Sequence, residues 1–233
     1  SGYYREIIVA FGQPQPKTSN ATAIKQRVFD LSVQSWQKHV ENLPTLTDAW
    51  ISSVRKAERR KLSLADGISA PLTADKALAA AWCLSHRIRR LSPEQNIGLL
   101  LPTSIGGVLC NMATLLAGKT IVNLNYTANA AALTTAIEQA EIRTIYTSRR
   151  FIERLEKKNA DVITVLQGKH LIYLEDLRSD IHFNESFWRW LAIRVLPTRI
   201  LKRVCNHTHD SQQTAAILFS SGSEGLPKGV MLS

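Results

Sequence analysis

The second half of the chain alternates short apolar runs with helix-like patterns, and this alternation limits the folds open to it. The expected strands lie at 97–101, 120–124, 143–148, 171–176 and 215–220. Helical patterns separate them, one of them over about 128–141 with Thr127 as a possible cap. Apolar strands that alternate with helices are typical of parallel βαβ units, whose sheet is covered on both faces. The sequence therefore predicts an α/β fold built on a parallel sheet.

The charge-free run 97–118 allows two interpretations. It is long enough to cross a bilayer. Pro102 and Ser104 interrupt it after a few residues, and Gly118 is a plausible helix stop. Ser104 is also a plausible helix N-cap. A strand, a short loop and a helix explain these interruptions better than a membrane span, so we expect a soluble chain without a transmembrane segment.

The residues before this region predict fewer strands. Residues 6–16 indicate a strand that ends at Gly12 and a Pro-containing turn, and residues 20–40 indicate an amphipathic helix. The stretch 41–67 is expected to be a connector, with helical character in 46–61. We expect a small strand–helix piece ahead of the α/β region.

Residues 72–91 predict a single helix that leads into the α/β region. Thr73 can cap it, and Asp75 suits the positive end of the helix dipole. The expected buried stripe consists of Leu78, Trp82 and Ile88.

The formal net charge of +10 suggests a polyanionic partner. The basic residues cluster at 55–61 and 189–203, and no nucleic-acid motif accompanies either cluster, so we expect no nucleic-acid partner. Around the second cluster, Phe187 and Trp188 mix with arginines, which suits an anionic membrane surface. The alternative is a helix packed on the sheet with a basic outer face, broken at Pro197.

The three cysteines, Cys83, Cys110 and Cys205, are far apart and include no CxxC spacing. We expect buried, reduced thiols in a cytosolic compartment. Cys205, His207 and His209 have a spacing that could hold a metal, but no fourth ligand set is visible. The favoured interpretation is a polar surface loop without a metal.

Residues 217–233, ILFSSGSEGLPKGVMLS, place a Gly- and Ser-rich turn behind an apolar strand. Glycine lets backbone N–H groups approach phosphate oxygens, serine hydroxyls add donors, and Lys228 adds a positive charge. The turn is not a Walker A loop, because Lys228 follows Pro227 and precedes Gly229. By composition alone, a simple connecting turn is an equal alternative.

The residue order SSGSEGLPKGV makes the turn more specific, because it resembles the phosphate-binding signature of the adenylate-forming (AMP-binding) enzymes. These include acyl-CoA synthetases, luciferases and peptide-synthetase adenylation domains. The resemblance covers residues 66–233 and implies the N-terminal portion of an adenylation domain, truncated after the loop. Residues 1–40 are then the tail of an acyltransferase-like domain, and 41–65 a linker. The resemblance implies these cofactor-binding residues: Ser220, Ser221, Gly222, Ser223, Glu224, Gly225 and Lys228.

Within that family, Glu224 and the runs NLNYTA (123–128) and YLEDLR (173–178) resemble one branch. It is the acyl-carrier-protein ligase part of bifunctional 2-acylglycerophosphoethanolamine acyltransferases, and residues 5–16 resemble the end of their acyltransferase domain. The resemblance implies ATP and Mg²⁺ as cofactors, and fatty acid, acyl carrier protein and lysophospholipid as partners. It also implies a location at the cytoplasmic face of the inner membrane. Lys228 would offset charge on the departing pyrophosphate.

Two alternatives to this branch stay open: an acyl-CoA ligase, and a non-catalytic basic module that binds a membrane or a carrier protein. The family's adenine-binding segment, magnesium-binding glutamate and C-terminal catalytic lysine have no counterpart here, and no histidine has an aspartate five positions on. We therefore assign no catalytic residue and expect the 233-residue chain alone to be inactive.

Overall fold

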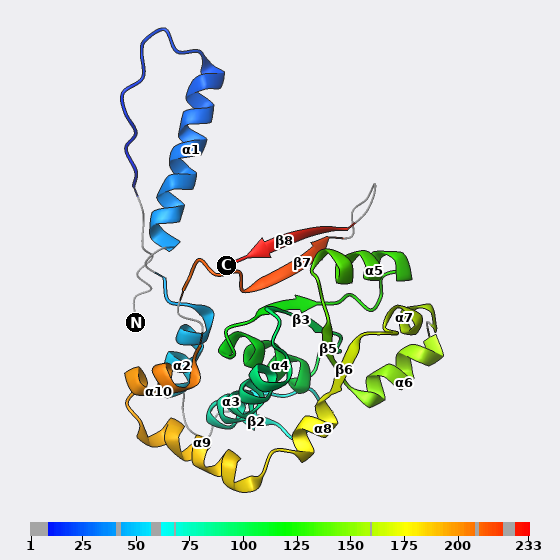
Figure 1. Cartoon of the computed structure of the whole chain (residues 1–233). Helices are drawn as coiled ribbons and strands as arrows, with labels where there is room; N and C mark the ends of the chain where they lie inside the picture. Colours follow the sequence, from blue (N-terminus) through cyan, green and yellow to red (C-terminus); the bar gives the residue numbers. More distant parts are fainter. Residues whose placement is uncertain are drawn as a thin grey trace. The chain divides into compact units, whose positions relative to one another are not determined.

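The computed structural model divides the chain into two compact units, Ser1–Pro44 and Thr45–Ser233 (Figure 1). The residues that it describes are 9–40, 43–56, 62–67, 69–158, 160–207, 210–220 and 227–233.

The first unit is built around helix α1 (Ala21–Val40), which confirms the predicted amphipathic helix. Asn20 begins it, because its side-chain Oδ1 accepts a hydrogen bond from the Ala23 N–H at 2.8 Å. No residue of α1 is buried. Residues 9–12 of the predicted strand are not in a strand, and the first part of that prediction lies outside the described residues. The described part of this unit offers no strand with which those residues could pair.

The second unit contains a six-stranded sheet in the order β6-β5-β3-β4-β7-β8. Its strands are β3 (Asn96–Leu99), β4 (Thr120–Asn123), β5 (Thr144–Thr147), β6 (His170–Tyr173), β7 (Ala216–Ser220) and β8 (Lys228–Leu232). The pairs from β6 to β7 are parallel, which confirms the predicted parallel βαβ units. Strand β8 is antiparallel to β7 and was not predicted. A smaller antiparallel pair joins β1 (Leu62–Leu64) to β2 (Leu72–Thr73).

The helices of this unit cover both faces of the sheet. They are α2 (Leu46–Lys56), α3 (Ala74–Leu91), α4 (Ile105–Leu116), α5 (Ala130–Gln139), α6 (Arg149–Lys158), α7 (Ala160–Val165), α8 (Leu174–Ser179), α9 (Phe183–Val195) and α10 (Thr198–Cys205). Ile121 packs into a cluster with α2, α3, α4, α9 and α10, whereas its neighbour Val122 packs into a cluster with α5, α6 and α7. Because successive side chains of a strand point to opposite faces, these clusters are the two outer interfaces of a three-layer sandwich.

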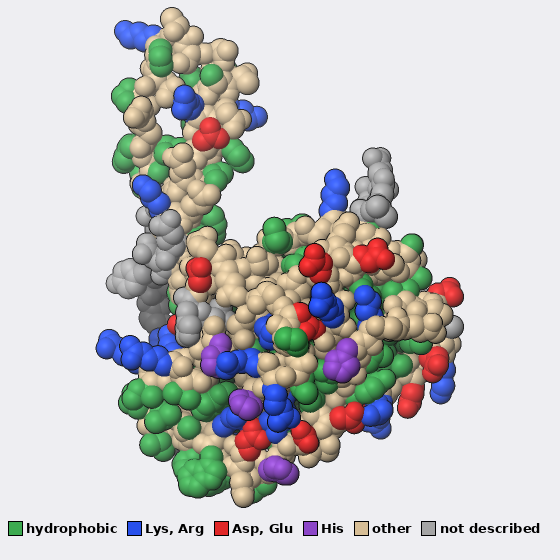
Figure 2. Space-filling view, in the orientation of Figure 1, with side chains coloured by type: hydrophobic (Ala, Val, Ile, Leu, Met, Phe, Trp, Pro, Cys, Tyr) green, Lys and Arg blue, Asp and Glu red, His purple; other side chains and the backbone are tan. Residues whose placement is uncertain are grey.

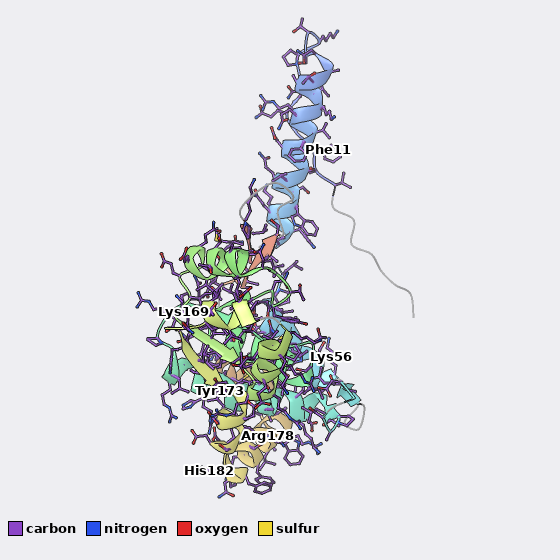
Figure 3. The ribbon with its side chains drawn as sticks, turned by 90° about the vertical axis from the view of Figure 1, so that its right-hand side faces the viewer. Phe11, Lys56, Lys169, Tyr173, Arg178 and His182 are labelled. Atoms are coloured by element: carbon purple, nitrogen blue, oxygen red, sulfur yellow. The ribbon has the colours of Figure 1, made fainter. Side chains whose placement is uncertain are left out.

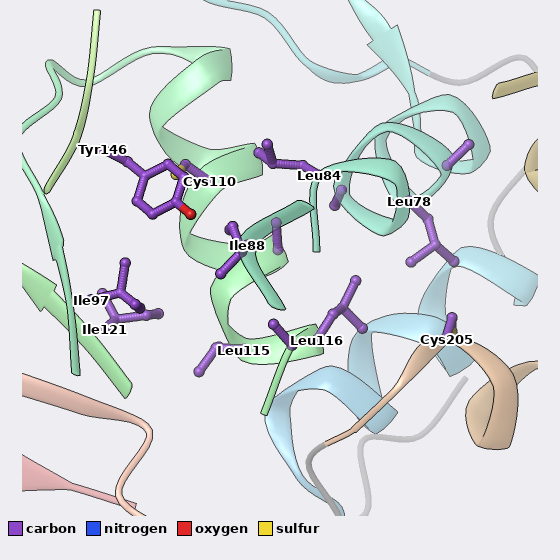
Figure 4. Close-up of a cluster of buried hydrophobic side chains, with 14 of the residues drawn as sticks. Leu78, Leu84, Ile88, Ile97, Cys110, Leu115, Leu116, Ile121, Tyr146 and Cys205 are labelled. Atoms are coloured by element: carbon purple, nitrogen blue, oxygen red, sulfur yellow. The ribbon is translucent and has the colours of Figure 1, made fainter. Parts of the chain in front are cut away.

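The larger cluster surrounds α3 and α4, whose side chains meet Tyr146 of β5 (Figure 4). Leu78 and Ile88 are fully buried, as predicted, and Trp82 is partly buried at the edge of the cluster. The Tyr146 hydroxyl hydrogen bonds the Ser92 hydroxyl at 2.8 Å, so its polar end is satisfied inside the core.

Three local predictions need correction. The connector 41–67 contains strand β1, which is stabilised by pairing with β2. The predicted strand 171–176 ends at Tyr173 and continues as α8, because its partner β5 ends opposite Tyr173. The cap of α5 is Asn129 and not Thr127, since the Asn129 Oδ1 accepts from the Ala132 N–H at 2.8 Å.

The run 97–118 forms β3, a loop and α4, as its interruptions predicted. Ser104 caps α4 by accepting from the Gly107 N–H at 3.2 Å. At the other end, the Gly118 N–H bonds the Leu115 carbonyl and the Lys119 N–H bonds the Thr114 carbonyl, which is a Schellman motif. Within the described residues, no helix has the length and apolar character needed to span a membrane.

Gly118→Ala is expected to lower the free energy of unfolding by about 2–3 kcal/mol. Gly118 has a φ of 74°, and a Cβ there would lie 2.9 Å from the His207 carbonyl oxygen. The left-handed conformation costs roughly 1–2 kcal/mol for a non-glycine residue, and the backbone contact adds to it. Urea unfolding measures the change.

Gly168→Ala is the matched control for this change. Gly168 has a similar φ of 78°, but a Cβ there meets nothing within 4 Å. It should cost only the conformational part, about 1 kcal/mol. Equal losses of unfolding free energy in the two variants would show that the close contact with the His207 carbonyl does not contribute to the effect of Gly118→Ala.

Candidate phosphate-binding hairpin

Strands β7 and β8 form a hairpin whose connection carries the predicted phosphate-binding residues. Ser220, the last residue of β7, pairs with Lys228, the first residue of β8. The Ser220 hydroxyl donates to the Lys228 carbonyl over a long 3.4 Å contact, and both residues are exposed. The other predicted ligands, Ser221, Gly222, Ser223, Glu224 and Gly225, lie outside the described residues.

Lys228 therefore projects from a paired strand and not from the loop in which the sequence placed it. Five residue pairs from Ala216–Leu232 to Ser220–Lys228 fix the stem. Gly229 packs closely against Phe219, because a Cβ there would lie 3.2 Å from the Phe219 ring and 3.3 Å from Ile217. The stem thus holds the lysine and the end of β7 at fixed positions on either side of the connection.

The hairpin connection leaves the carboxyl end of β7. In parallel α/β sheets, ligands bind outside the carboxyl ends of the strands. The loops after β3, β4 and β5, and the helices that follow them, begin at this same edge. Ser220 and Lys228, the two predicted phosphate-binding residues that the structure describes, therefore lie on the edge of the sheet that suits a ligand.

The N-termini of α4 and α6 on this edge are already occupied by side chains of the chain. The Ile105 N–H at the start of α4 donates to the Asp66 carboxylate at 2.9 Å. The Arg149 N–H at the start of α6 donates to the Glu175 carboxylate, which also accepts from the Ser148 hydroxyl at 2.8 Å. Burial acts to raise the pKa of Glu175, but these hydrogen bonds outweigh it and hold the pKa below its ordinary value. Because the N-termini of α4 and α6 are occupied in this way, the hairpin is a better candidate for phosphate than either of them.

The second candidate, a metal at Cys205, His207 and His209, is not supported. Cys205 is fully buried in the core, and burial raises the pKa of its thiol to about 12. The His207 Nε2 lies 2.6 Å from the Arg89 guanidinium, and His209 lies outside the described residues. The part of the chain that the structure describes contains no group of three residues able to hold a metal.

The other two thiols agree with the expectation of buried, unpaired cysteines. Cys83 and Cys110 are free and fully buried. Burial raises the pKa of both thiols, so neither has the thiolate character of a nucleophile.

In the basic segment 189–203, the α9 part does not form the basic outer face that was one of the two interpretations, whereas Arg199 and Arg203 of α10 are exposed. Arg189 pairs with Glu185, and Arg194 pairs with Asp75 at 2.8 Å, both on the side of α9 that faces α3. The break at Pro197 is confirmed, because α9 ends at Val195 and α10 begins at Thr198. In the first basic cluster, Arg55 donates to the Ile193 carbonyl at 2.6 Å, and residues 57–61 lie outside the described residues.

Solved structures with this arrangement of helices and strands are adenylate-forming enzymes. The structure resembles VinN in complex with 3-methylaspartate, with a TM-score of 0.57 and 16% identity over 80% of this chain and 46% of that one. It also resembles O-succinylbenzoate coenzyme A synthetase from Bacillus subtilis in complex with AMP, with a TM-score of 0.52 and 16% identity over 78% and 41% of the two chains. The fold is the N-terminal part of an adenylate-forming domain.

The sequence comparison gives the family. The model of the AMP-binding enzymes matches residues 55–233, and the chain belongs to that family. A relative in Lecanicillium sp, nonribosomal peptide synthetase vlms, is 29% identical over 151 residues, which are 64% of this chain and 2% of the synthetase. The chain also spans less than half of each of the two solved chains.

Proposed function

We propose that this chain forms the phosphate-holding part of a ligase that activates fatty acids with ATP. The observation that carries the proposal is the hairpin, which holds Lys228 opposite Ser220 at the carboxyl edge of the sheet. The family match over residues 55–233 supports the use of ATP. The residues that complete the connection, Ser221–Gly225, are proposed as further phosphate ligands on the strength of their order in the sequence.

The proposed reaction has two steps. A fatty carboxylate attacks the α-phosphorus of ATP, and pyrophosphate leaves to give an acyl-adenylate. A thiol then displaces AMP. The Lys228 ammonium group extends from the first residue of a paired strand, and its proposed role is to stabilise the charge that develops on the leaving pyrophosphate. Mg²⁺, which the resemblance implies, finds no set of protein ligands within the described residues, and we assign it no step.

For the finer function we propose acyl carrier protein as the acceptor and a lysophospholipid as the final acyl acceptor, at the cytoplasmic face of the inner membrane. The runs 123–128 and 173–178 support this branch, and residues 1–40 are proposed as the end of an acyltransferase domain joined by the linker 41–65. Coenzyme A is the alternative acceptor, favoured by the likeness to a coenzyme A synthetase. Binding of holo-carrier protein and of coenzyme A to the immobilised chain would separate the two.

Lys228→Ala is expected to weaken binding of ATP and of inorganic pyrophosphate by about tenfold, because one charged phosphate contact is lost. Isothermal titration of the 233-residue chain measures both affinities. Lys157→Ala is the matched control, since Lys157 is equally exposed but lies at the end of α6. Unchanged binding in Lys228→Ala would contradict the phosphate role and favour a non-catalytic module.

The chain alone is expected to form no acyl-adenylate. With a fatty acid present, the rate of ATP–pyrophosphate exchange by the unmodified chain should be no higher than that of the Lys228→Ala variant. Exchange above that level would show that the residues present suffice for the first step.

A further inference from the structure

The outer surface of α9 and α10 carries a band of exposed apolar side chains next to a basic hollow, and the proposed phosphate chemistry uses neither. The band consists of Phe183, Phe187, Trp188, Val195, Ile200 and Val204, whose exposed fractions run from 41% to 81%. Figure 2 shows apolar side chains gathered at the lower left and the bottom of the molecule, over α10 and α9. Tyr173, Arg178 and His182 mark the path of the chain from β6 through α8 to the start of α9 (Figure 3).

Helix α9 has its paired charges on its inner side and exposes several apolar side chains on its outer side. Arg189 and Glu185 pair on the side that packs against α3, and Ile193 is 2% exposed on that side. Trp188 and Val195 lie on the opposite side, two turns apart. An outward apolar stripe on a helix whose inner face is already packed is unusual for a surface that meets only water.

Helix α10 continues the band and adds positive charge. Leu201 and Cys205 are buried, so Ile200 and Val204, one turn apart, point outward together with Arg199 and Arg203.

Between α2 and α10 lies a hollow of about 250 Å³, lined by Asp48, Arg199, Lys202 and Arg203. Lys202 contacts Asp48 at 3.6 Å. Within the described residues, Arg199 and Arg203 form no ion pair. Among the described residues, the two guanidinium groups of this hollow therefore have no ion-pair partner, and they lie beside the apolar band.

We propose that α9 and α10 bind the surface of an anionic phospholipid membrane, with the apolar band in the acyl boundary and Arg199 and Arg203 on lipid phosphates. Helices that lie in the membrane interface combine an apolar face with flanking arginines in this way. The charge complementarity selects an anionic surface, and the protruding aromatic side chains select a bilayer.

The test is co-sedimentation of the 233-residue chain with vesicles of mixed phosphatidylglycerol and phosphatidylcholine, and with vesicles of phosphatidylcholine alone. We expect binding to the anionic vesicles and weak binding to the neutral ones. The double variant Arg199→Gln/Arg203→Gln should lose roughly 25-fold in affinity, about fivefold per arginine. The double variant Phe183→Ser/Trp188→Ser should lose at least as much.

Two variants serve as matched controls, and both should bind like the unmodified chain. Lys157→Gln/Lys158→Gln removes two exposed charges at the end of α6, and Met231→Ser removes an apolar side chain that is 71% exposed on β8. Brominated lipids should quench part of the tryptophan fluorescence, and Trp188→Phe should reduce that quenching.

Equal binding to the two vesicle types, no binding, or equal losses in the control variants would overturn the proposal. Binding to an acidic carrier protein that depends on the arginines, with no vesicle binding, would also overturn it and would identify the partner as a protein.

Discussion

Glu185→Gln is expected to lower the free energy of unfolding by about 3 kcal/mol, because it leaves a buried arginine without its anion. The Arg87 side chain is only 8% exposed, and both of its terminal nitrogens donate to the Glu185 carboxylate at 2.7 Å. Arg87 also donates to the Asp180 carbonyl at 2.7 Å, which ties α3 to the start of α9. Urea unfolding of the variant and the unmodified chain measures the loss.

The double variant Arg87→Met/Glu185→Leu is the control for this first prediction. Replacing a buried ion pair by apolar side chains of similar size is often neutral, whereas breaking it is not. The double variant should therefore lose much less than Glu185→Gln. A double variant as unstable as the single one would show that packing, and not the charge of Arg87, causes the loss.

The Arg87–Glu185 pair also predicts how the destabilisation by Glu185→Gln depends on pH. The hydrogen bonds from Arg87, against the opposing effect of burial, hold the pKa of Glu185 at about 2 in the folded chain, below an ordinary value of 4.5. A depressed carboxylate pKa stabilises the folded state above about pH 4.5, and this stabilisation is lost as the pH falls towards about 2. The stability difference between the unmodified chain and Glu185→Gln should shrink over that range. A constant difference would contradict the assignment.

Asp75→Ala is expected to lower the free energy of unfolding by about 2–3 kcal/mol. Asp75 begins α3, and its Oδ2 accepts from Trp190 Nε1 at 2.9 Å and from Arg194 Nη2 at 2.8 Å. Its side chain is only 12% exposed, so removing it leaves two partly buried donors without an acceptor. Burial acts to raise the pKa of Asp75, but the hydrogen bonds outweigh it and lower the pKa. Thermal or urea unfolding measures the change.

Asp176→Ala is the matched control, because it also removes an aspartate that pairs with an arginine. The Arg149–Asp176 pair lies at 2.6 Å, but both side chains are more than half exposed. Exposed ion pairs contribute under about 1 kcal/mol, so this variant should be nearly as stable as the unmodified chain. Losses of similar size at Asp75 and Asp176 would show that the attachment of α9 to α3 does not depend on the Asp75 contacts.

Much of the fold could be predicted because each prediction rested on neighbouring residues. Ser104 and Gly118 bound α4, and apolar runs mark β3, β4, β5 and β7. Strand β8 was missed, because its residues carry a weak apolar pattern and it is stabilised only by pairing with β7. Because β8 begins at Lys228, this lysine lies at a strand end and not in the predicted loop.

The orientation of α9 could not be predicted from its own residues. Its arginines and aromatic side chains alternate around the helix, so either set could have faced outward. Arg194 pairs with Asp75, which is 119 residues away in the sequence. Arg189 pairs with Glu185. Glu185 in turn accepts a hydrogen bond from Arg87, 98 residues away. On α9 the expected basic outer face is absent, because Arg194 pairs with Asp75, a residue distant in the chain, and Arg189 pairs with Glu185.

The sequence by itself determined the helices and most of the strands, the family resemblance, and the order of residues at the candidate phosphate-binding connection. Backbone hydrogen bonding, capping and side-chain periodicity act over a few residues, so they can be read locally. The tertiary structure alone decided the strand order, the pairing of Ser220 with Lys228, and which side of α9 meets solvent. All three features depend on contacts between segments that are distant in the sequence. For α9 the physical reason is that a buried charge without an oppositely charged partner loses its solvation energy without compensation.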